Sequence, residues 1–248
     1  MKIGLLTVIY GEGAGKYIRN IDAQTTKLDH RFCQLVVDHG SHDFSKKDFE
    51  SRSIAYFQSK NLGFSSGVNI GLFQIFNQLK CEYVIVLNPD IQYKFDELNE
   101  LQGALNEDFY VLEVIEHGEK KSIQYYSYLT GKISTSEKYF SFPYFNGAGF
   151  CISNNLYNRI GGFDIAFFLY FEDLDYSRKL YVNNVIINKI ETTNLIHEVG
   201  GSRALQKRID IERIAAISAI RFTLKWFPWN LWLLMRYMLK WLLAPFRY

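Results

Sequence analysis

The stretch Tyr83-Val84-Ile85-Val86-Leu87-Asn88-Pro89-Asp90 decides the fold of this 248-residue chain. Its first five residues are apolar without alternation, and the run stops abruptly at an Asn-Pro pair. A short unbroken apolar run of this kind is typical of a strand buried on both faces, as in parallel sheets that are covered by helices. The polar residues that follow would then lie just beyond the carboxyl end of the strand.

Outward from this strand, short apolar runs alternate with stretches of helical spacing. The runs predict further strands over residues 3–10, 33–37, 54–57 and 185–190. The helical stretches cover residues 15–29, 67–79, 157–162 and 174–182, whereas residues 109–142 are less periodic and predict strands and loops. This alternation predicts an α/β fold with a mostly parallel central sheet flanked by helices, a nucleotide-binding architecture whose ligands bind beyond the carboxyl ends of the strands.

The composition is that of a globular protein, with 48% hydrophobic, 22% charged and 17% aromatic residues. The net charge of +2 is unevenly distributed: residues 203–248 carry +7, from nine Lys or Arg against two acidic residues, and residues 1–202 carry −5. An acidic body with a basic tail argues against nucleic-acid binding, which needs positive charge along the binding groove. Three scattered cysteines, and an N-terminal apolar run with no small-residue cleavage site after it, favour a cytoplasmic protein.

Two acidic residues follow predicted strands. Asp38 would accept a hydrogen bond from the ring N–H of a uracil or thymine; the alternative is a turn-starting aspartate, because Asp-x-Gly-Ser favours turns. Asp90 would hold a divalent cation that bridges two phosphates, since Mg²⁺ and Mn²⁺ prefer oxygen and need few protein ligands. The alternative for Asp90 is the turn that Pro89 imposes.

Three carboxylates, Glu172, Asp173 and Asp175, fall within four positions at the start of a predicted helix. Capping that helix and complementing its dipole would need only one of them. Mutual repulsion raises the pKa of at least one carboxyl group, as in a general base, so the cluster favours a catalytic function. Further on, His197 follows another apolar run and is either a ligand or a structural histidine.

Two other motifs do not support a site. Gly11-Glu12-Gly13-Ala14-Gly15-Lys16 lacks both the spacing of a phosphate-binding loop and the third glycine of a dinucleotide fingerprint, and therefore predicts an ordinary loop. His39 and His42 have no third ligand nearby to make a zinc site.

Taken in order, six strings resemble glycosyltransferase family two, the inverting GT-A group, and specifically its bacterial rhamnosyltransferase-like branch. The resemblance covers roughly residues 3–202. It is carried by Val-Val-Asp-His-Gly-Ser-His-Asp at 36–43, Asn-Leu-Gly-Phe-Ser-Ser-Gly-Val-Asn at 61–69, Leu-Asn-Pro-Asp-Ile at 87–91, Asn-Gly-Ala-Gly-Phe at 146–150, the segment 161–175, and His197.

The resemblance implies a GT-A nucleotide-sugar-binding fold and the transfer of a sugar, with inversion, from a nucleotide-sugar donor to a hydroxyl of a glycan acceptor. Asp173 would be the general base, oriented by Glu172 and Asp175. Asp90 and His197 would be the ligands of a divalent metal, Mg²⁺ or Mn²⁺.

The remaining implied positions concern the substrates. Asp38 would read the base, and Asn88 replaces the first acid of the family's Asp-x-Asp motif. Asn61, Gly63 and Asn69 would shape the loop and helix near the donor, and Gly147 and Gly149 would form a loop beside the acceptor. The branch often uses dTDP-L-rhamnose, which makes L-rhamnose the leading donor sugar.

The C-terminal stretch over residues 221–248 is almost wholly apolar and contains four tryptophans. On one continuous helix its five basic residues would share a stripe roughly 100° wide, which predicts a helix lying in a membrane surface rather than spanning it. Pro228 would kink or divide that helix, and the alternative is a helix that packs on the core or in a dimer. A membrane-lying tail suits a glycan acceptor carried on a polyprenyl-diphosphate lipid.

We therefore expect a GT-A glycosyltransferase domain over residues 1–202 and a basic, Trp-rich helical tail over 203–248. The expected function is metal-dependent hexosyl transfer in bacterial surface polysaccharide synthesis, such as that of lipopolysaccharide O-antigen, at the inner face of the cell membrane. Two alternatives stay open: a sugar nucleotidyltransferase, and a catalytically inactive membrane-bound scaffold of the same fold.

Overall fold

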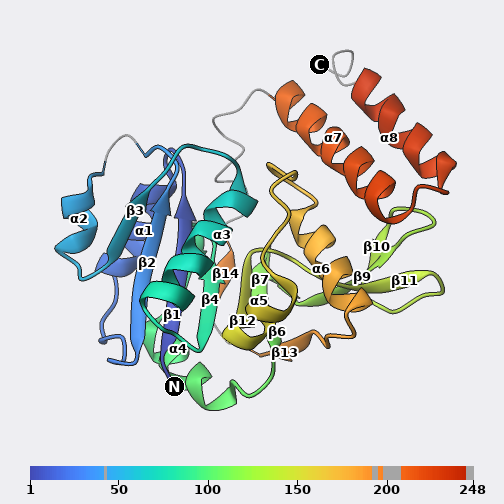
Figure 1. Cartoon of the computed structure of the whole chain (residues 1–248). Coiled ribbons are helices and arrows are strands. Elements are labelled where there is room, and N and C mark those ends of the chain that lie inside the picture. Colours follow the sequence, from blue (N-terminus) through green and yellow to red (C-terminus); the bar gives the residue numbers. More distant parts are fainter. Residues whose placement is uncertain (42–43, 192–194, 198–207, 244–248) are drawn as a thin grey trace.

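The computed structural model describes residues 1–41, 44–191, 195–197 and 208–243 (Figure 1). Its central sheet has seven strands in the order β13-β6-β12-β4-β1-β2-β3. The strands are β1 (Ile3–Ile9), β2 (Phe32–Asp38), β3 (Ala55–Gln58), β4 (Tyr83–Leu87), β6 (Phe109–Leu112), β12 (Gly149–Ser153) and β13 (Asn188–Ile190). Strand β12 runs antiparallel to both of its neighbours, and the other pairs of this sheet are parallel. The predicted mostly parallel sheet is therefore confirmed.

Burial on both faces explains the unbroken apolar run that opened the sequence. In β4, Val84 and Val86 face one core together with the helices α3 (Phe64–Phe73), α5 (Asn154–Ile160) and α6 (Glu172–Val182). Ile85 and Leu87 face the opposite core, which includes α4 (Phe95–Leu101). Helix α1 (Gly13–Asp22) packs with the short α2 (Lys46–Glu50) in a third cluster against β1 and β2. Alternate residues of one strand thus fill two cores, as a covered sheet requires.

The topology brings several strand ends to one edge of the sheet. The carboxyl ends of the parallel strands β1, β2 and β4 lie at this edge, and the antiparallel β12 begins there because Gly149 pairs with Leu87. Residues that follow β1, β2 and β4, and residues that precede β12, are consequently neighbours. This is the edge where ligands bind in open α/β sheets.

Most predicted helices occur with shifted ends. Helix α1 stops at Asp22 rather than at residue 29, because the Gln24 side chain bonds the Tyr93 carbonyl and accepts from the Phe95 N–H outside the helix. The predicted helix over 67–79 is α3 continued by the π-helical turn η1 (Gln74–Gln78). Helix α5 begins earlier than predicted, at its Ser153 cap, and a 3₁₀ turn η2 (Gln102–Ala104) follows α4.

Two small sheets cover the region predicted as strands and loops, which confirms that expectation. One has the order β10 (Ile133–Ser134), β9 (Ile123–Ser127), β11 (Ser141–Phe145) and packs beside α6. The other has the order β5 (Ile91–Gln92), β14 (Ile196–His197), β7 (Val114–Glu116), β8 (Glu119–Lys121). The second sheet joins the segment after β4 to the segment that ends at residue 197.

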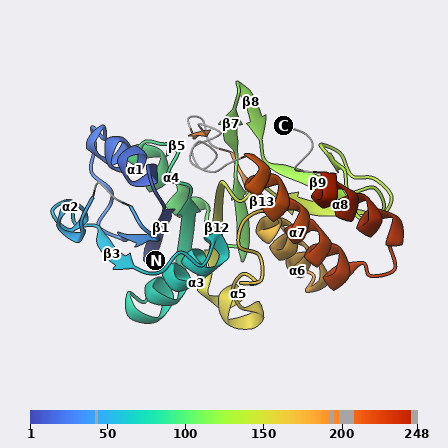
Figure 2. The same cartoon turned by 90° about the horizontal axis from the view of Figure 1, so that it is seen from above.

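The C-terminal region forms a helical hairpin rather than one continuous helix (Figure 1, Figure 2). Helix α7 (Arg208–Trp226) and helix α8 (Leu231–Leu243) are separated by a turn that contains Pro228, and Asn230 caps α8 by accepting from the Leu233 N–H. The single charged stripe expected over 221–248 is therefore wrong for the described part, and residues 244–248 lie outside it. No helix in the described ranges has the length and apolar character needed to cross a membrane. The expected domain boundary at residues 202 and 203 also lies outside the described residues.

Candidate active site

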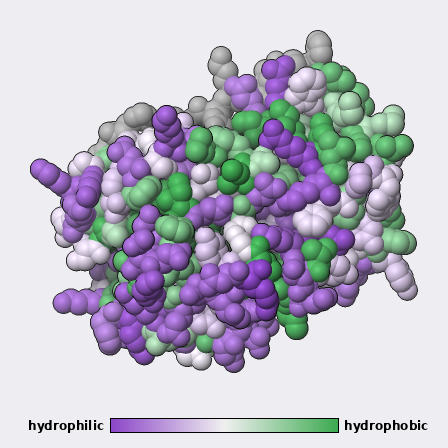
Figure 3. Space-filling view, in the orientation of Figure 1, coloured by the Kyte–Doolittle hydropathy of each residue, from purple (hydrophilic) through white to green (hydrophobic). Residues whose placement is uncertain are grey.

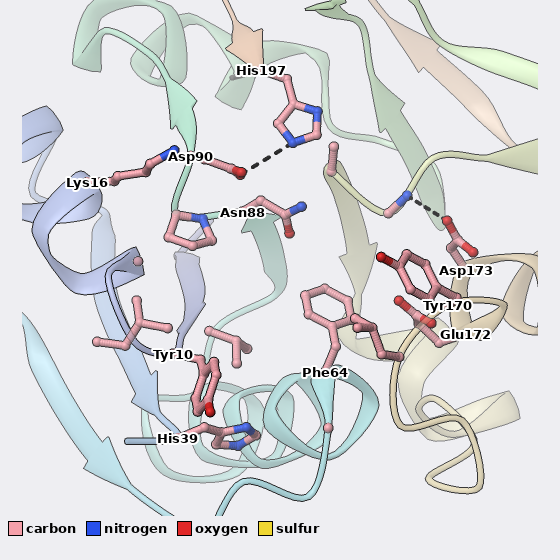
Figure 4. A pocket seen from close by; sticks show the side chains of 18 of the residues that line it. Tyr10, Lys16, His39, Phe64, Asn88, Asp90, Tyr170, Glu172, Asp173 and His197 are labelled. Carbon is pink, nitrogen blue, oxygen red and sulfur yellow. Dashed lines mark hydrogen bonds and ion pairs between the residues drawn. The ribbon is translucent and has the colours of Figure 1, made fainter. Parts of the chain in front are cut away.

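A cavity of about 380 Å³ opens at the sheet edge where the strand ends meet (Figure 4). This volume lies in the range typical of small-molecule sites. Its wall includes most of the residues that the sequence singled out, namely Asn61, Gly63, Asn88, Asp90, Gly147, Glu172, Asp173 and His197. Residues far apart in the chain are thus brought to one place, with the acidic pair of α6 on one side and Asp90 with His197 on the other (Figure 4).

Asp173 is held in place by donors from three directions. Its Oδ2 accepts from the Tyr144 hydroxyl at 3.0 Å and from the Gly147 N–H at 3.3 Å, and its Oδ1 accepts from the Leu174 N–H at 2.7 Å. Burial raises the pKa of Asp173 above its ordinary value, and these hydrogen bonds oppose the rise by stabilising the carboxylate. The result is a fixed carboxyl group with one lone pair of Oδ1 left for a substrate hydroxyl.

The backbone that enters α6 adopts an uncommon conformation. Tyr170 and Phe171 both have positive φ, 65° and 68°, which is costly for large side chains. The turn brings Glu172 and Asp173 onto the cavity wall at the first turn of the helix. Burial, and then the charge of Asp173, raise the pKa of Glu172, whose Oε2 is buried without a hydrogen-bond partner.

Asp90 and His197 lie together on the other side of the cavity. The Asp90 Oδ1 lies 3.3 Å from the His197 Nε2, and the Glu116 Oε1 lies 2.6 Å from the His197 Nδ1. Burial lowers the pKa of His197, but the hydrogen bonds to Asp90 and Glu116 outweigh it, so the net pKa is raised.

The residues around Asp90 fit a divalent cation. Neighbouring ligands on an octahedral ion at 2.0–2.1 Å stand about 3 Å apart, close to the Asp90–His197 separation. The Asn88 Oδ1, on the same wall, is buried without a partner and supplies a further oxygen. No group of three His, Cys, Asp or Glu side chains converges in the described residues, so a cation here would depend on substrate oxygens for its remaining ligands.

The structure corrects the expectation for Asp38. The side chain is fully buried, and its carboxylate already accepts four hydrogen bonds, from the Gly40 N–H, the Ser41 N–H, the Ser41 hydroxyl and the Tyr56 hydroxyl. Burial acts to raise the pKa of Asp38, and the four donors hold it below its ordinary value. With its lone pairs occupied, Asp38 shapes the turn after β2, whereas its neighbour His39 lines the cavity. His42 lies outside the described residues.

Asp175 is likewise not a cavity residue. Its side chain is 2% exposed and accepts from Lys225 at 2.9 Å and from the Trp226 indole N–H at 2.6 Å. Burial raises the pKa of Asp175, and Lys225 and Trp226 oppose that rise. Instead of orienting substrate, Asp175 ties α6 to α7.

Of the three residues expected near the donor, Asn61 and Gly63 lie on the cavity wall and Asn69 does not. Asn61 accepts from the Gly63 N–H, and both residues line the cavity. Gly63 has φ 93°, and a Cβ there would lie 2.3 Å from the Phe168 carbonyl oxygen, so only glycine fits. Asn69, by contrast, is away from the cavity wall and bonds both the N–H and the carbonyl of Phe163 at 2.8 Å.

The glycine loop before β12 contributes one residue to the cavity. Gly147 lines it, and a Cβ there would lie 3.3 Å from the Asp173 Cβ. Gly149 is buried in β12 against Leu87 and does not line the cavity, because the antiparallel pairing has begun by that residue.

Sequence reasoning missed four residues of the site. Lys16 and Gly13 line the cavity from α1, although their segment predicted an ordinary loop. Glu116 and Tyr144 contact His197 and Asp173. Gly13 and Lys16 belong to a glycine-rich segment that matches no phosphate-binding motif, and Glu116 and Tyr144 belong to no motif. Only the folded topology brings these residues to the site.

Comparison with protein-family models finds no match. The low-salt glycan biosynthesis hexosyltransferase Agl10 of Haloferax volcanii is 26% identical over 182 residues. The match covers 66% of this chain, and the chain spans only 58% of the length of that relative.

Solved structures share the fold at low sequence identity. The mannosyltransferase PcManGT of Pyrobaculum calidifontis, in complex with GDP-Man and Mn²⁺, has a TM-score of 0.57 at 14% identity, over 100% of this chain and 76% of its own. The structure of residues 1–349 of S. aureus TarS has a TM-score of 0.56 at 15% sequence identity, over 98% of this chain and 81% of its own. The 4-diphosphocytidyl-2C-methyl-D-erythritol synthase of Anaerococcus prevotii has a TM-score of 0.52 at 10% sequence identity, over 87% of this chain and 95% of its own. The fold of this chain is thus the mixed α/β fold of the GT-A glycosyltransferases, with a central, mostly parallel sheet flanked by helices.

Proposed function

We propose that the protein is an inverting, metal-dependent glycosyltransferase that moves a hexose from a nucleotide-sugar donor to a hydroxyl of a glycan acceptor. The observation that carries the proposal is one cavity with two chemically different walls. One wall has the Asp90–His197 pair, and the other has the half-buried Glu172–Asp173 pair. Such a cavity separates a leaving diphosphate from an attacking hydroxyl.

The first wall would hold the donor diphosphate. Asp90, His197 and Asn88 would hold a divalent cation, which when bound neutralises charge on the departing diphosphate. Lys16 is the one lysine or arginine on the cavity wall within the described residues, and it lies on the Asp90 side (Figure 4). Its ammonium adds positive charge where the diphosphate would lie.

The nucleoside would extend from there toward the end of β2. Tyr10, His39 and Asn61 line this part of the cavity, and Tyr10 is half exposed and presents a ring on which a base can stack. Burial lowers the pKa of His39 and keeps the imidazole neutral, so that it offers one donor and one acceptor. These neighbours take over the base contact that the saturated Asp38 cannot make.

On the second wall, Asp173 acts as the general base. Its carboxylate would accept the proton of the acceptor hydroxyl while that oxygen attacks the anomeric carbon on the face opposite the diphosphate, which inverts the configuration. Tyr144 and Gly147 keep the carboxylate from rotating away. Glu172 shares this wall, and its raised pKa favours the neutral carboxyl group, which would limit repulsion of the Asp173 carboxylate.

The finer assignments rest on the family resemblance. L-rhamnose from dTDP-L-rhamnose is the leading donor, and the hexosyltransferase relative is consistent with a hexose. The acceptor would be a glycan on a polyprenyl-diphosphate lipid, used in surface polysaccharide synthesis such as that of O-antigen. That acceptor would place the protein at the inner face of the cell membrane.

The test of this function is the product released from a panel of nucleotide sugars with Mn²⁺. We expect thermal stabilisation by one donor, with dTDP-L-rhamnose first, and release of a nucleoside diphosphate on transfer. Release of pyrophosphate from a nucleoside triphosphate and a sugar phosphate would instead identify a nucleotidyltransferase. Binding without turnover of any donor, in the presence of membrane extract as acceptor source, would identify an inactive scaffold.

A further inference from the structure

Glu116 lies at the end of β7 on the cavity wall, and it has no role in the sugar transfer proposed above. Its side chain is mostly buried, with 14% exposed. The small sheet places it beside His197: Ile91 pairs with His197 across β5 and β14, and Ile196 pairs with Ile115 across β14 and β7. Asp90, which directly precedes β5, is therefore close to His197 of β14 and Glu116 of β7.

The two carboxylates contact opposite sides of the His197 ring. Glu116 reaches Nδ1 at 2.6 Å, whereas Asp90 faces Nε2 at 3.3 Å. A carboxylate only accepts hydrogen bonds, so the imidazole must carry its proton on Nδ1 to bond Glu116. Nε2, on the Asp90 side of the ring, is then the nitrogen that would release its proton from Asp90 and coordinate a cation in the cavity (Figure 4). Glu116 thus contacts the ring nitrogen that does not face Asp90, and within the described ranges the three side chains do not converge as ligands of one ion.

Glu116 is itself anchored. The Asn146 side-chain amide donates to the Glu116 Oε1 at 3.1 Å, and the Asn146 Oδ1 accepts from the Ala148 N–H at 3.2 Å. Gly147, between these two residues, donates its N–H to Asp173. One short loop thus fixes both the group that holds His197 and the proposed base.

The geometry assigns Glu116 as a positioning residue, held by Asn146, that fixes the orientation and tautomer of His197 for a divalent cation bound with Asp90. This inference rests on the metal-dependent function proposed above. A carboxylate that acts only through a histidine ligand changes metal affinity without touching the metal.

The test is a double-mutant cycle on the affinity of the full-length protein for Mn²⁺ alone, read from the electron paramagnetic resonance signal of the free ion. We expect Glu116→Ala to weaken binding by about tenfold or more. In the His197→Ala background, Glu116→Ala should cause no further loss of Mn²⁺ affinity, because Glu116 acts on the cation only through His197. Glu116→Gln, which keeps a carbonyl acceptor for the Nδ1 proton, should retain more affinity than Glu116→Ala.

Glu119→Ala is the matched control, since this exposed carboxylate on the adjacent strand β8 pairs with Lys121 and does not contact His197. It should leave Mn²⁺ affinity within about twofold. Circular dichroism identifies variants that fail to fold, and for those the Glu116→Gln and Glu116→Asp series replaces the alanine. Unchanged affinity in folded Glu116→Ala, or an equal loss in the His197→Ala background, would overturn the inference.

The transfer assay separates this inference from the proposed function. A wild-type protein that releases nucleoside diphosphate but does not bind Mn²⁺ would overturn the role of Glu116 and leave the glycosyltransferase. If the Mn²⁺ affinities followed the predicted double-mutant cycle but the protein transferred no sugar, the positioning role of Glu116 would be supported and the proposed function overturned.

Discussion

Asp173 shows how single residues tune the proposed base. Burial in the wall of the cavity favours its neutral form, and the hydroxyl of Tyr144 favours its charged form. Partial burial of Tyr144 and the charge of Asp173 in turn raise the pKa of its phenol, which stays protonated as a donor. The balance leaves a carboxyl group whose pKa lies above that of an ordinary aspartate.

Replacing Tyr144 with Phe should shift the pH profile of the reaction. The lost hydrogen bond stabilised the carboxylate, so the pKa of Asp173 rises further. A base must be deprotonated to act, so activity is present above its pKa and lost as the pH falls through it. We therefore expect the acidic limb of kcat/KM to move upward by about one pH unit, the equivalent of about 1.4 kcal/mol.

Tyr126→Phe is the matched control for this measurement. It removes a buried hydroxyl whose partner is Tyr237 and leaves Asp173 untouched. Its profile should overlay that of the wild type. Superimposable profiles for Tyr144→Phe and wild type would show that another group sets the acidic limb.

At the scale of elements, the proposed base depends on how α6 is held at its start and along its length. The irregular segment over residues 163–171 leads into α6 and lines the cavity through Phe168, Leu169 and Tyr170. Helix α7 supports this segment, because Ser218 donates to the Leu169 carbonyl at 3.0 Å and Lys225 bonds Asp164 at 2.7 Å. The C-terminal hairpin is thus part of the framework of the site.

Lys225→Met should destabilise the whole protein. The buried carboxylate of Asp175 would keep the Trp226 indole N–H as a donor but lose its opposite charge, and breaking such a pair costs about 3 kcal/mol. Urea unfolding followed by circular dichroism measures the change in the free energy of unfolding. Adding Asp175→Asn should recover part of the loss, since the unpaired charge is then removed.

The control for this prediction is Lys121→Met, which removes a lysine from an exposed pair with Glu119. Pairs of that kind contribute about 0–1 kcal/mol. Equal effects of the two substitutions would mean that the Lys225–Asp175 contact does not hold α7 to α6.

For the whole molecule, the hairpin also presents a large apolar surface. Side chains of α8 are exposed along much of its length, and Trp229 is exposed in the turn before it. The exposed apolar residues of the helix are Leu231, Trp232, Met235, Met238, Leu239, Trp241, Leu242 and Leu243. Figure 3 shows this hydrophobic colour gathered over the α7–α8 corner. Exposed tryptophan and aliphatic residues on a helix bordered by Arg236 and Lys240 favour burial in the surface of an anionic membrane.

Met235→Gln with Met238→Gln should therefore weaken binding to anionic lipid vesicles by about tenfold in co-sedimentation, because two exposed apolar side chains no longer enter the bilayer surface. Ile186→Gln is the control, since Ile186 is equally exposed but lies on the body rather than on the hairpin. If the double variant still sedimented like the wild type, the hairpin face would have another partner, such as a second copy of the chain.

The sequence predicted what depends on local pattern and missed what depends on distant partners. The apolar run of β4 alone indicates a covered sheet, and the acid at its end indicates a ligand edge. Asp175 bonds Lys225, Asp38 bonds Tyr56, and Asn69 bonds Phe163. Each partner is distant in sequence, so no short motif could predict that these polar side chains are taken up by structural contacts. Glu116 becomes visible only through the register of β7 against β14. Local pattern thus gives the elements, and topology decides which polar side chains share the cavity.

The most direct test of the central claim compares the wild type with Asp173→Asn for donor binding and sugar transfer. Because the amide cannot accept a proton, transfer should fall by about 10²–10⁴-fold, while stabilisation by the nucleotide sugar with Mn²⁺ stays within about twofold. Asp96→Asn, an exposed change on α4, should leave both unchanged. Near-wild-type transfer by Asp173→Asn would contradict the account.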